Sequence, residues 1–571
     1  MTVDFDNGDL RCIRVGNTEI IRRIYMVFQD RNWTSRPWIV DAAEIDQAPD
    51  SFSVCFTARG TFDASAFTWS CMIDGDSDGS ITYLVTGETT ENFVRNRLGV
   101  CVLHPMTLAG TLVRIEHAGG GSAEAHFPDT IAAHQPFFNI RAITHRIAPG
   151  VNARLELGGE VFETEDHRNW GDASYKTYCT PITLPFPVTV EPGWRFEQFA
   201  RLTLDGAQLS YESSATTIEI EVFDAVSPLP MIGLQANGER LMRAHLDALR
   251  LLALDHLRID IYPNPDAKQA ERCLRKAAVE AQALGCLLHV AVFDADTREL
   301  ERLARVNQEL EGVVARWFIF RSDEKVTSRT WTDQARTALG VDACIGGGTN
   351  LYFTELNRQP PDTTDIDVVN FSMNPQVHSF DNRTLIQNAA TAMVIAQNAP
   401  RLAGNARISV APITLRPRFN PNATDPEVDV SNDHLPATDD FRQPTWFAAA
   451  WTALSIGFLA GPGTIDSATY FETVGPRGVI DARTAEPYPV HALFAALAGH
   501  TSVRLCESSQ PEVCDALIIE NSAGSRLIVV NMSAWERDVH LHGFLNERIT
   551  AAAHGLTIVD RPGGIHDQTA I

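Results

Sequence analysis

The sequence has no closely spaced cysteine pairs and no long uninterrupted hydrophobic run. Its ten cysteines are scattered without a single C-x-x-C motif, which argues against a disulfide framework and against a cysteine-based zinc site. The longest apolar stretch, residues 447–460, is too short to span a bilayer and is interrupted by Thr452 and Ser455. Residues 1–6 lack the basic and apolar regions of a signal peptide, so the sequence predicts a cytoplasmic protein.

Positive charge is also scarce. The chain has 47 Lys and Arg against 72 Asp and Glu, which gives a formal net charge of −25. Binding to nucleic acid or to an anionic membrane depends on clustered basic residues, so the sequence predicts neither partner. The remaining composition, 44% hydrophobic and 21% charged over 571 residues, is that of a globular protein with several domains.

Residues 1–228 are rich in short β-branched runs separated by turn residues, and this pattern predicts an N-terminal β-sandwich domain. The acidic run 74–79 resembles part of a calcium loop. However, Val85 stands where such a loop needs a glutamate at its twelfth position. We therefore expect a solvated hairpin turn at this run.

Residues 229–500 alternate apolar strands with helical stretches, which predicts parallel βα units. Eight strands and a TIM (β/α)8 barrel follow from this pattern. The expected strands are 231–235, 256–262, 286–293, 316–321, 342–347, 367–373, 407–412 and 463–470. Residues 501–571 return to strands and predict a small C-terminal β-domain, which either packs beside the barrel or completes a sheet with the N-terminal region.

In a TIM barrel the active site lies where the strands end, and these positions are rich in carboxylates, carboxamides and arginines. Such groups suit a polyhydroxylated ligand. Glu355 and Glu472 are the candidate general acid and base, although a single carboxylate at such a rim is more often a solvated loop residue or half of an ion pair. The candidate substrate contacts at the rim are Asn350, Asn374, His378 and Arg416.

His378 has three open interpretations: a base, a donor to the ligand or an ordinary loop histidine. Residues 162–178 are unusually dense in functional groups, among them Asp166, Arg168 and Trp170. They form either an exposed loop or a segment that reaches over the barrel mouth and completes the site, with Trp170 as a stacking wall for a sugar.

The sequence predicts no cofactor and no metal site, although the many oxygen ligands at the barrel rim leave Mg²⁺ or Ca²⁺ binding open. The run Gly346, Gly347 and Gly348 is not followed by Gly-Lys-[Ser/Thr], so it is no P-loop. His540 and His542 would share one face of a strand, but the sequence shows no third ligand near them.

Three segments, 165–178, 346–358 and 470–478, resemble the D-apionate lactonase family, and the resemblance extends over the whole chain. It implies an enzyme that opens D-apionolactone to D-apionate in apiose catabolism, with a small-molecule sugar lactone as its partner. The residue roles given above are inferred from this chain and not carried over from the family. The oligomeric state stays open.

Two other functions remain possible from the sequence. A glycoside hydrolase could use the same glutamates, because the planar carbon of a lactone resembles an oxocarbenium centre. In the large clan of retaining barrel glycosidases, Asn-Glu ends strand four and Glu ends strand seven. Here strand four ends in Asp323 and Glu324, and residues 412–416 contain no Glu. A carbohydrate-binding protein without catalysis is the third possibility.

Overall fold

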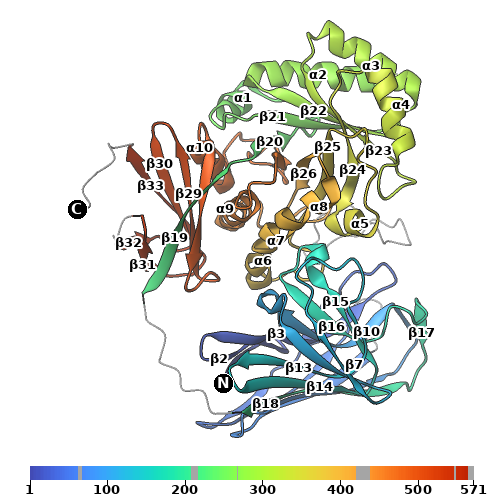
Figure 1. The fold of residues 1–571 in the computed structure, drawn as a ribbon, viewed down its shortest axis with the longest axis vertical. Helices are drawn as coiled ribbons and strands as arrows, with labels where there is room; N and C mark the ends of the chain where they lie inside the picture. The colour runs from blue at the N-terminus through green and yellow to red at the C-terminus, as the bar shows by residue number, and fades with distance from the viewer. Residues whose placement is uncertain (62–66, 207–216, 267, 419–437, 545–547, 563–571) are drawn as a thin grey trace. The chain divides into compact units, whose positions relative to one another are not determined.

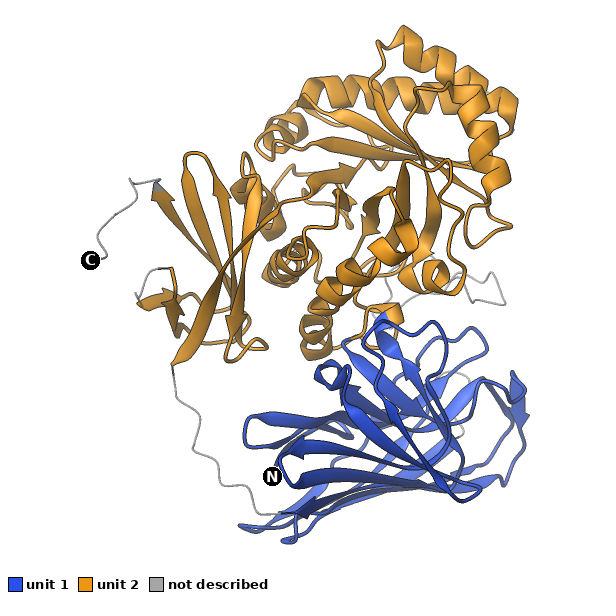
Figure 2. Cartoon of the chain, in the orientation of Figure 1, with its two compact units in different colours: residues 1–168, 173–214, 422–427 blue, residues 169–172, 215–421, 428–571 orange. Residues whose placement is uncertain are grey.

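The structure is a computed structural model that describes residues 1–61, 67–206, 217–266, 268–418, 438–544 and 548–562. The described residues form two compact units (Figure 2). The first unit contains residues 1–168 with 173–206, and the second contains residues 169–172 with the described residues from 217 onward. The second unit therefore combines the two domains that the sequence predicts at residues 229–500 and 501–571.

The first unit is built from strands and confirms the predicted β-sandwich. Its main sheet has 16 strands, and one hydrophobic core collects residues such as Phe28, Trp69 and Phe137 from all along it. Strand β7 alternates buried and exposed side chains, as a strand with one face in a core does. The strands of this unit are β1 (Thr2–Asp6), β2 (Asp9–Val15), β3 (Thr18–Gln29), β4 (Ile39–Val40), β5 (Glu44–Gln47), β6 (Phe52–Arg59), β7 (Phe67–Gly75), β8 (Ile81–Thr89), β9 (Phe93–Arg95), β10 (Arg97–Pro105), β11 (Leu112–His117), β12 (Ser122–His126), β13 (Phe137–Ala148), β14 (Val151–Gly158), β15 (Phe162–Asp166), β16 (Ser174–Tyr178), β17 (Val188–Val190) and β18 (Arg195–Gly206). The 3-10 helix η2 (Met106–Leu108) also belongs to it, and η3 (His167–Trp170) begins in it.

The acidic run 74–79 lies in the hairpin that joins antiparallel strands β7 and β8. The amide of Gly79 donates to the carbonyl of Asp76, and the Asp78 carboxylate accepts from the amide of Ser80. The run is the hairpin turn that its composition predicts. It also contains the letters G-x-S-x-G at residues 75–79, but a nucleophile elbow needs a strand followed by a helix, so Ser77 is not such a nucleophile.

The second unit contains a closed barrel of eight parallel strands (Figure 1), which confirms the predicted TIM barrel. Each strand overlaps its predicted range. In barrel order they are β20 (Met231–Gln235), β21 (His256–Ile261), β22 (Leu287–Phe293), β23 (Val314–Phe320), β24 (Ile345–Tyr352), β25 (Val368–Met373), β26 (Arg407–Ile413) and β27 (Ser467–Glu472).

Helices follow most of the barrel strands. In α2, Leu274, Ala277 and Ala281 are buried along one stripe, and the helix ends at Gly285, whose φ of 75° is a left-handed conformation that suits glycine. The helices of this unit are α1 (Arg243–Arg250), α2 (Gln269–Leu284), α3 (Thr297–Glu309), α4 (Arg329–Leu339), α5 (Phe353–Arg358), α6 (Asn382–Ala389), α7 (Thr391–Asn398), α8 (Pro400–Ala403), α9 (Trp446–Ala460) and α10 (Pro489–Leu497). None of the described helices is both long and apolar enough to cross a membrane.

Helix α9 contains the longest apolar run of the sequence and is buried on nearly every side. It packs against α6, α7 and α10 of the barrel and also against strands of the C-terminal sheet. Helix α9 is apolar on all sides because the barrel helices pack against one side of it and the C-terminal sheet packs against another.

The C-terminal sheet has seven strands in the order β32-β31-β19-β28-β29-β30-β33. They are β19 (Ile218–Pro228), β28 (Ser502–Ser508), β29 (Cys514–Asn521), β30 (Gly524–Asn531), β31 (Arg537–His542), β32 (Arg548–Ala551) and β33 (Gly555–Pro562). Strand β19 falls inside the predicted N-terminal domain 1–228, yet it pairs in parallel with β31 and antiparallel with β28. The N-terminal β-domain therefore ends before β19. The predicted boundary at residue 228 is wrong because the alternating pattern of a strand does not identify its partner strand.

Candidate active site

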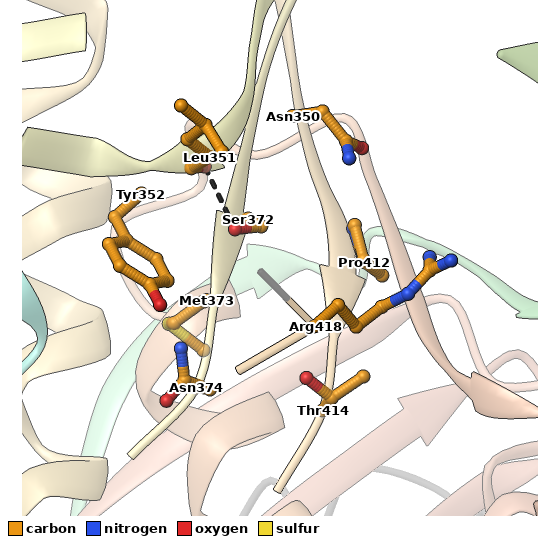
Figure 3. Close-up of a pocket in the computed structure, with 9 residues that line it drawn as sticks. All are labelled: Asn350, Leu351, Tyr352, Ser372, Met373, Asn374, Pro412, Thr414 and Arg418. Atoms are coloured by element: carbon orange, nitrogen blue, oxygen red, sulfur yellow. Dashed lines mark hydrogen bonds between the residues drawn. The ribbon is translucent and has the colours of Figure 1, made fainter. Parts of the chain in front are cut away.

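A pocket opens at the carboxyl ends of the adjacent strands β24, β25 and β26, which is the end of a TIM barrel that carries active sites. It is a small hollow that is partly open to solvent. Figure 3 shows Asn350 and Arg418 toward one side, with Tyr352, Met373 and Asn374 toward the other. The lining residues are Asn350, Leu351, Tyr352, Ser372, Met373, Asn374, Pro412, Thr414 and Arg418. Two of them, Asn350 and Asn374, are substrate contacts predicted from the sequence.

A network of charged groups fixes one side of this pocket. The buried Arg258 donates to the Asn350 side-chain oxygen at 2.6 Å and to the Asp260 carboxylate at 2.9 Å. Asp260 also pairs with Arg418 at 3.0 Å, and Arg418 donates to Gln235 at 2.6 Å. Burial alone would raise the pKa of Asp260, but the two arginines outweigh burial and lower it. The carboxylate therefore stays ionised and holds the Arg418 guanidinium in the pocket wall.

Glu355 lies in the first turn of α5, directly after β24, and is 3% exposed. Its Oε1 lies 3.7 Å from the Lys325 ammonium, whereas Oε2 is buried and has no hydrogen-bond partner in the described part of the chain. Burial raises the pKa of Glu355, and Lys325 and Arg358 offset only part of that rise. Burial, and then the nearby Glu355 carboxyl, also raise the pKa of the pocket residue Tyr352. Glu355 thus lies beside the pocket with the setting of a proton-transfer group.

Glu472 is the last residue of β27 and lies at a part of the barrel mouth outside the pocket lining. Its Oε1 accepts from Arg477 Nε at 2.8 Å, and Arg477 also pairs with Asp439. Glu472 stands opposite Gln235 in the strand register, and Gln235 holds Arg418. Neither glutamate lines the pocket, and no described hydrogen bond joins them to each other. Their convergence on one ligand stays a prediction.

Residues 169–172 group with the barrel although they follow β15 of the first unit. The ring of Trp170 meets the rings of Tyr352 and His378 edge-on, with centroids 6.0 and 5.7 Å away. The Arg358 guanidinium lies over the Trp170 ring at 5.3 Å. The structure therefore brings Trp170 and His378 together beside Tyr352, which belongs to the pocket wall.

Hydrogen bonds hold residues 169–172 in this position. The Asn169 carbonyl accepts from Thr354 at 2.7 Å, and its side-chain oxygen accepts from Asn357 at 2.8 Å. The Asp172 carboxylate lies 2.7 Å from His378 Nδ1 and accepts from Asn388 at 3.1 Å. A carboxylate at Nδ1 fixes the orientation of the imidazole ring.

Arg416 does not line the pocket. Its Nε pairs with Asp440 at 3.1 Å. Asp440 also accepts from both side-chain nitrogens Nε and Nη2 of Arg442 at 2.8 Å and from Gln376 at 2.7 Å. Burial alone would raise the pKa of Asp440, but its hydrogen bonds with Arg442 and Gln376 lower it to about 2. This network holds the segments after β25 and β26 together, and a substrate contact by Arg416 stays a prediction.

Asp166 and Arg168 form a buried ion pair inside the first unit, with Nη2 of Arg168 2.7 Å from Oδ2 of Asp166. The same guanidinium donates to the carbonyls of Pro128 and Asp129, and Asp166 accepts from the amide of Ala132. These contacts fix the loop around residues 128–132. A direct role of the pair in ligand binding stays a prediction.

Arg418 is the cation that lines the pocket, whereas Arg416 was the residue predicted from the sequence. Arg418 and Thr414 follow β26 just as Arg416 does, but past the end of a strand the alternation of sides no longer predicts where a residue points. Arg258 lies inside β21, where a buried arginine in an otherwise apolar strand is a signal that could have been used. Asp172 was visible in the dense segment 162–178, but its partner His378 is 206 residues away.

Comparisons with known proteins give one family. Residues 1–207 match the profile of the D-apionate lactonase N-terminal domain, and residues 231–502 match that of the D-apionate lactonase TIM barrel domain. A D-apionate lactonase from Brucella anthropi is 29% identical over 518 residues, which cover 85% of this chain and 83% of the relative.

Solved structures with detectable similarity are more distant. A glycoside hydrolase family 30 subfamily 8 xylanase from Clostridium acetobutylicum is 11% identical with a TM-score of 0.40, covering 61% of this chain and 97% of the xylanase. A rhamnosyl-glucuronidase from Fusarium oxysporum is 9% identical with a TM-score of 0.38, covering 60% of this chain and 95% of that one.

Proposed function

Because the chain belongs to the D-apionate lactonase family, we propose that it is a hydrolase that opens a small branched sugar lactone, D-apionolactone, to D-apionate. The observation that carries this proposal is the pocket at the ends of β24, β25 and β26. Its wall combines a fixed guanidinium with amide and hydroxyl groups, and a buried carboxyl with a raised pKa lies beside it.

The reaction begins with attack of water on the lactone carbonyl carbon. We assign Arg418 and Asn350 to the oxygen of that carbonyl, which becomes negatively charged in the tetrahedral intermediate. Arg258 and Asp260 hold these two side chains in place before the substrate arrives. Asn374 and Thr414 are the assigned contacts for the hydroxyl groups of the sugar, and Trp170 and His378 are assigned to its outer side.

Two proton transfers complete the reaction. Glu472 takes the proton of the attacking water, and the carbonyl C–O bond to the ring oxygen then breaks. Glu355 gives its proton to the departing ring oxygen, which becomes a hydroxyl group. The raised pKa of Glu355 favours the protonated form that this role needs, whereas Glu472 is paired with a guanidinium, so the two carboxyls have different settings. The product is a hydroxy acid, which releases one proton to solvent at neutral pH.

Glycoside hydrolysis with the same residues is less well supported. Glu324, at the position of the retaining acid in barrel glycosidases, accepts from Ser328 and from the Trp331 indole and so fixes the turn into α4. The segment after β26 has no carboxylate until Asp439 among the described residues. Among the residues that the structure describes, the pocket therefore lacks the pair of carboxylates at the usual strand ends.

Substitution of the two glutamates tests the proposal. Glu355→Gln and Glu472→Gln should each lower kcat for lactone hydrolysis by about 10² or more, the scale of one lost acid or base. Proton release from a panel of aldonolactones, followed with a pH indicator beside aryl glycosides, measures this. Glu280→Gln is the matched control, because burial also raises the pKa of Glu280, on α2 of the barrel. Wild-type lactone rates in both active-site variants, or turnover of aryl glycosides alone, would contradict the proposal.

A further inference from the structure

Strand β31 carries two histidines on the same face. His540 and His542 alternate with Val539 and Leu541, which are buried in the hydrophobic core of the C-terminal sheet. Both histidines therefore point to the other face of the sheet. Two histidines alone do not make a metal site, and the sequence offers no third ligand near them.

The fold brings a third ligand from a distant part of the chain. Strand β19 pairs in parallel with β31, with Glu219 opposite His540 and Glu221 opposite His542. Ile218 and Ile220 of β19 face the core, so Glu219 lies on the same face as the histidines. The Glu219 carboxylate is separated from His540 by 321 residues along the chain.

The three side chains meet at one point. Oε2 of Glu219 lies 3.1 Å from Nδ1 of His540 and 2.6 Å from Nε2 of His542. All three ligand atoms lie within 4.8 Å of one another. Ligands about 2.0–2.1 Å from a tetrahedral zinc ion are about 3.3–3.4 Å apart, so small side-chain rotations open this cluster to that geometry.

Partial exposure gives an ion access to the cluster. The exposed fractions of the side chains are 28% for His540, 49% for His542 and 42% for Glu219. This leaves room for water as a fourth ligand.

The surrounding charge is acidic on balance. Glu221 and Glu507 are cross-strand partners beside the cluster, whereas Arg548 opposite His540 is the one cation that the described strand pairings place next to it. Two imidazoles and a carboxylate form a ligand set typical of zinc and other divalent transition metals.

We propose that Glu219, His540 and His542 bind a divalent transition-metal ion, with Zn²⁺ as the expected occupant, and that the ion fastens β19 to β31. The site is structural. Helix α9 of the barrel packs against β28, β29, β30 and β33, whereas the ligands lie on β19 and β31, toward the opposite edge of the sheet (Figure 1). The ion would join the strand that enters the second unit to a strand near the end of the chain.

Zinc titration of the full chain tests the proposal. After treatment with EDTA and its removal, calorimetric titration with ZnCl₂ should show one equivalent bound, and Zn²⁺ should raise the Tm. His540→Ala, His542→Ala and Glu219→Gln should each weaken that binding by about 10-fold or more, and Zn²⁺ should then raise the Tm less. Mg²⁺ should not compete, because it prefers oxygen ligands.

His126→Ala is the matched control, because His126 is an exposed strand histidine of the first unit. It should bind Zn²⁺ like the wild type. Since all three ligands are partly exposed, circular dichroism should show each variant folded before titration. Unchanged zinc affinity and Tm shift in all three ligand variants, or no zinc bound by the wild type, would overturn the proposal.

Discussion

Glu355 and Asp440 are both buried carboxyl groups at the barrel mouth, and their surroundings are opposite. Asp440 accepts hydrogen bonds from Arg442, Arg416 and Gln376, and its pKa is lowered to about 2. Glu355 has Lys325 3.7 Å from Oε1 and Arg358 nearby, its Oε2 has no hydrogen-bond partner among the described residues, and burial raises its pKa. The difference teaches that partners, and not burial, decide whether a buried acid stabilises the fold or is available for proton transfer.

The largest effect is expected from breaking the Asp440 network. Asp440→Asn leaves the buried Arg442 without its counter-charge and should lower the free energy of unfolding by about 3–5 kcal/mol. Glu355→Gln replaces a poorly partnered acid with a neutral amide of similar size and should lower it by about 1 kcal/mol or less. Urea unfolding of both variants at neutral pH measures the difference. Equal losses of unfolding free energy in Asp440→Asn and Glu355→Gln would contradict the conclusion that their partners set the two carboxyl groups apart.

The barrel was predictable because buried parallel strands and amphipathic helices each leave a periodic pattern over many residues. All eight strands overlap their predicted ranges for this reason. The partner of β19 was not predictable, because its alternating pattern fits any sheet with one buried face.

The site was predictable to the level of the strand ends, but not of single side chains. Glu355 and Asn350 follow from the end of β24, and the structure gives the first a perturbed pKa and places the second in the pocket wall. After β26 the sequence alone does not distinguish Arg416 from Arg418 as a site residue. Only the folded chain shows that Arg416 pairs with Asp440 and Arg418 with Asp260. Such pairs depend on contacts across long stretches of sequence, which no local pattern contains.

The next largest effect is expected on kcat/KM, from substitution of Arg418 compared with Arg416. Arg418→Met should lower kcat/KM for the lactone by about 10²–10³, the scale of one lost oxyanion donor. Arg416→Met removes a partner of Asp440 outside the pocket and should cost less than about tenfold, since its loss acts on the fold and not on developing charge. Steady-state kinetics of the two variants, each shown to be folded, decide between them. A larger loss for Arg416→Met would instead support the role that the sequence alone predicts for Arg416.

Asp515 extends the comparison to a buried acid far from the barrel mouth. It lies on β29, accepts from the amide of Ala516 and has no paired cation among its described contacts. Burial raises its pKa from 3.8 to about 7, the Ala516 amide offsets part of that rise, and nearby Glu507 adds to it. If partners decide the state of a buried acid, Asp515 should behave like Glu355 and opposite to Asp440.

The sign of its pH dependence follows from that shift. Between about pH 4 and pH 7 the folded chain keeps the Asp515 proton while the unfolded chain releases it, so the stability that it contributes is lost as pH rises, by at most about 1.4 kcal/mol per pH unit. Asp515→Asn should remove this slope, and urea unfolding at pH 5, 6, 7 and 8 measures it. Asp538→Asn, at an exposed position on β31, should keep the wild-type slope. Parallel curves for wild type and Asp515→Asn would mean that Asp515 is ionised in the folded chain, and burial without a cation would then not suffice to hold its proton.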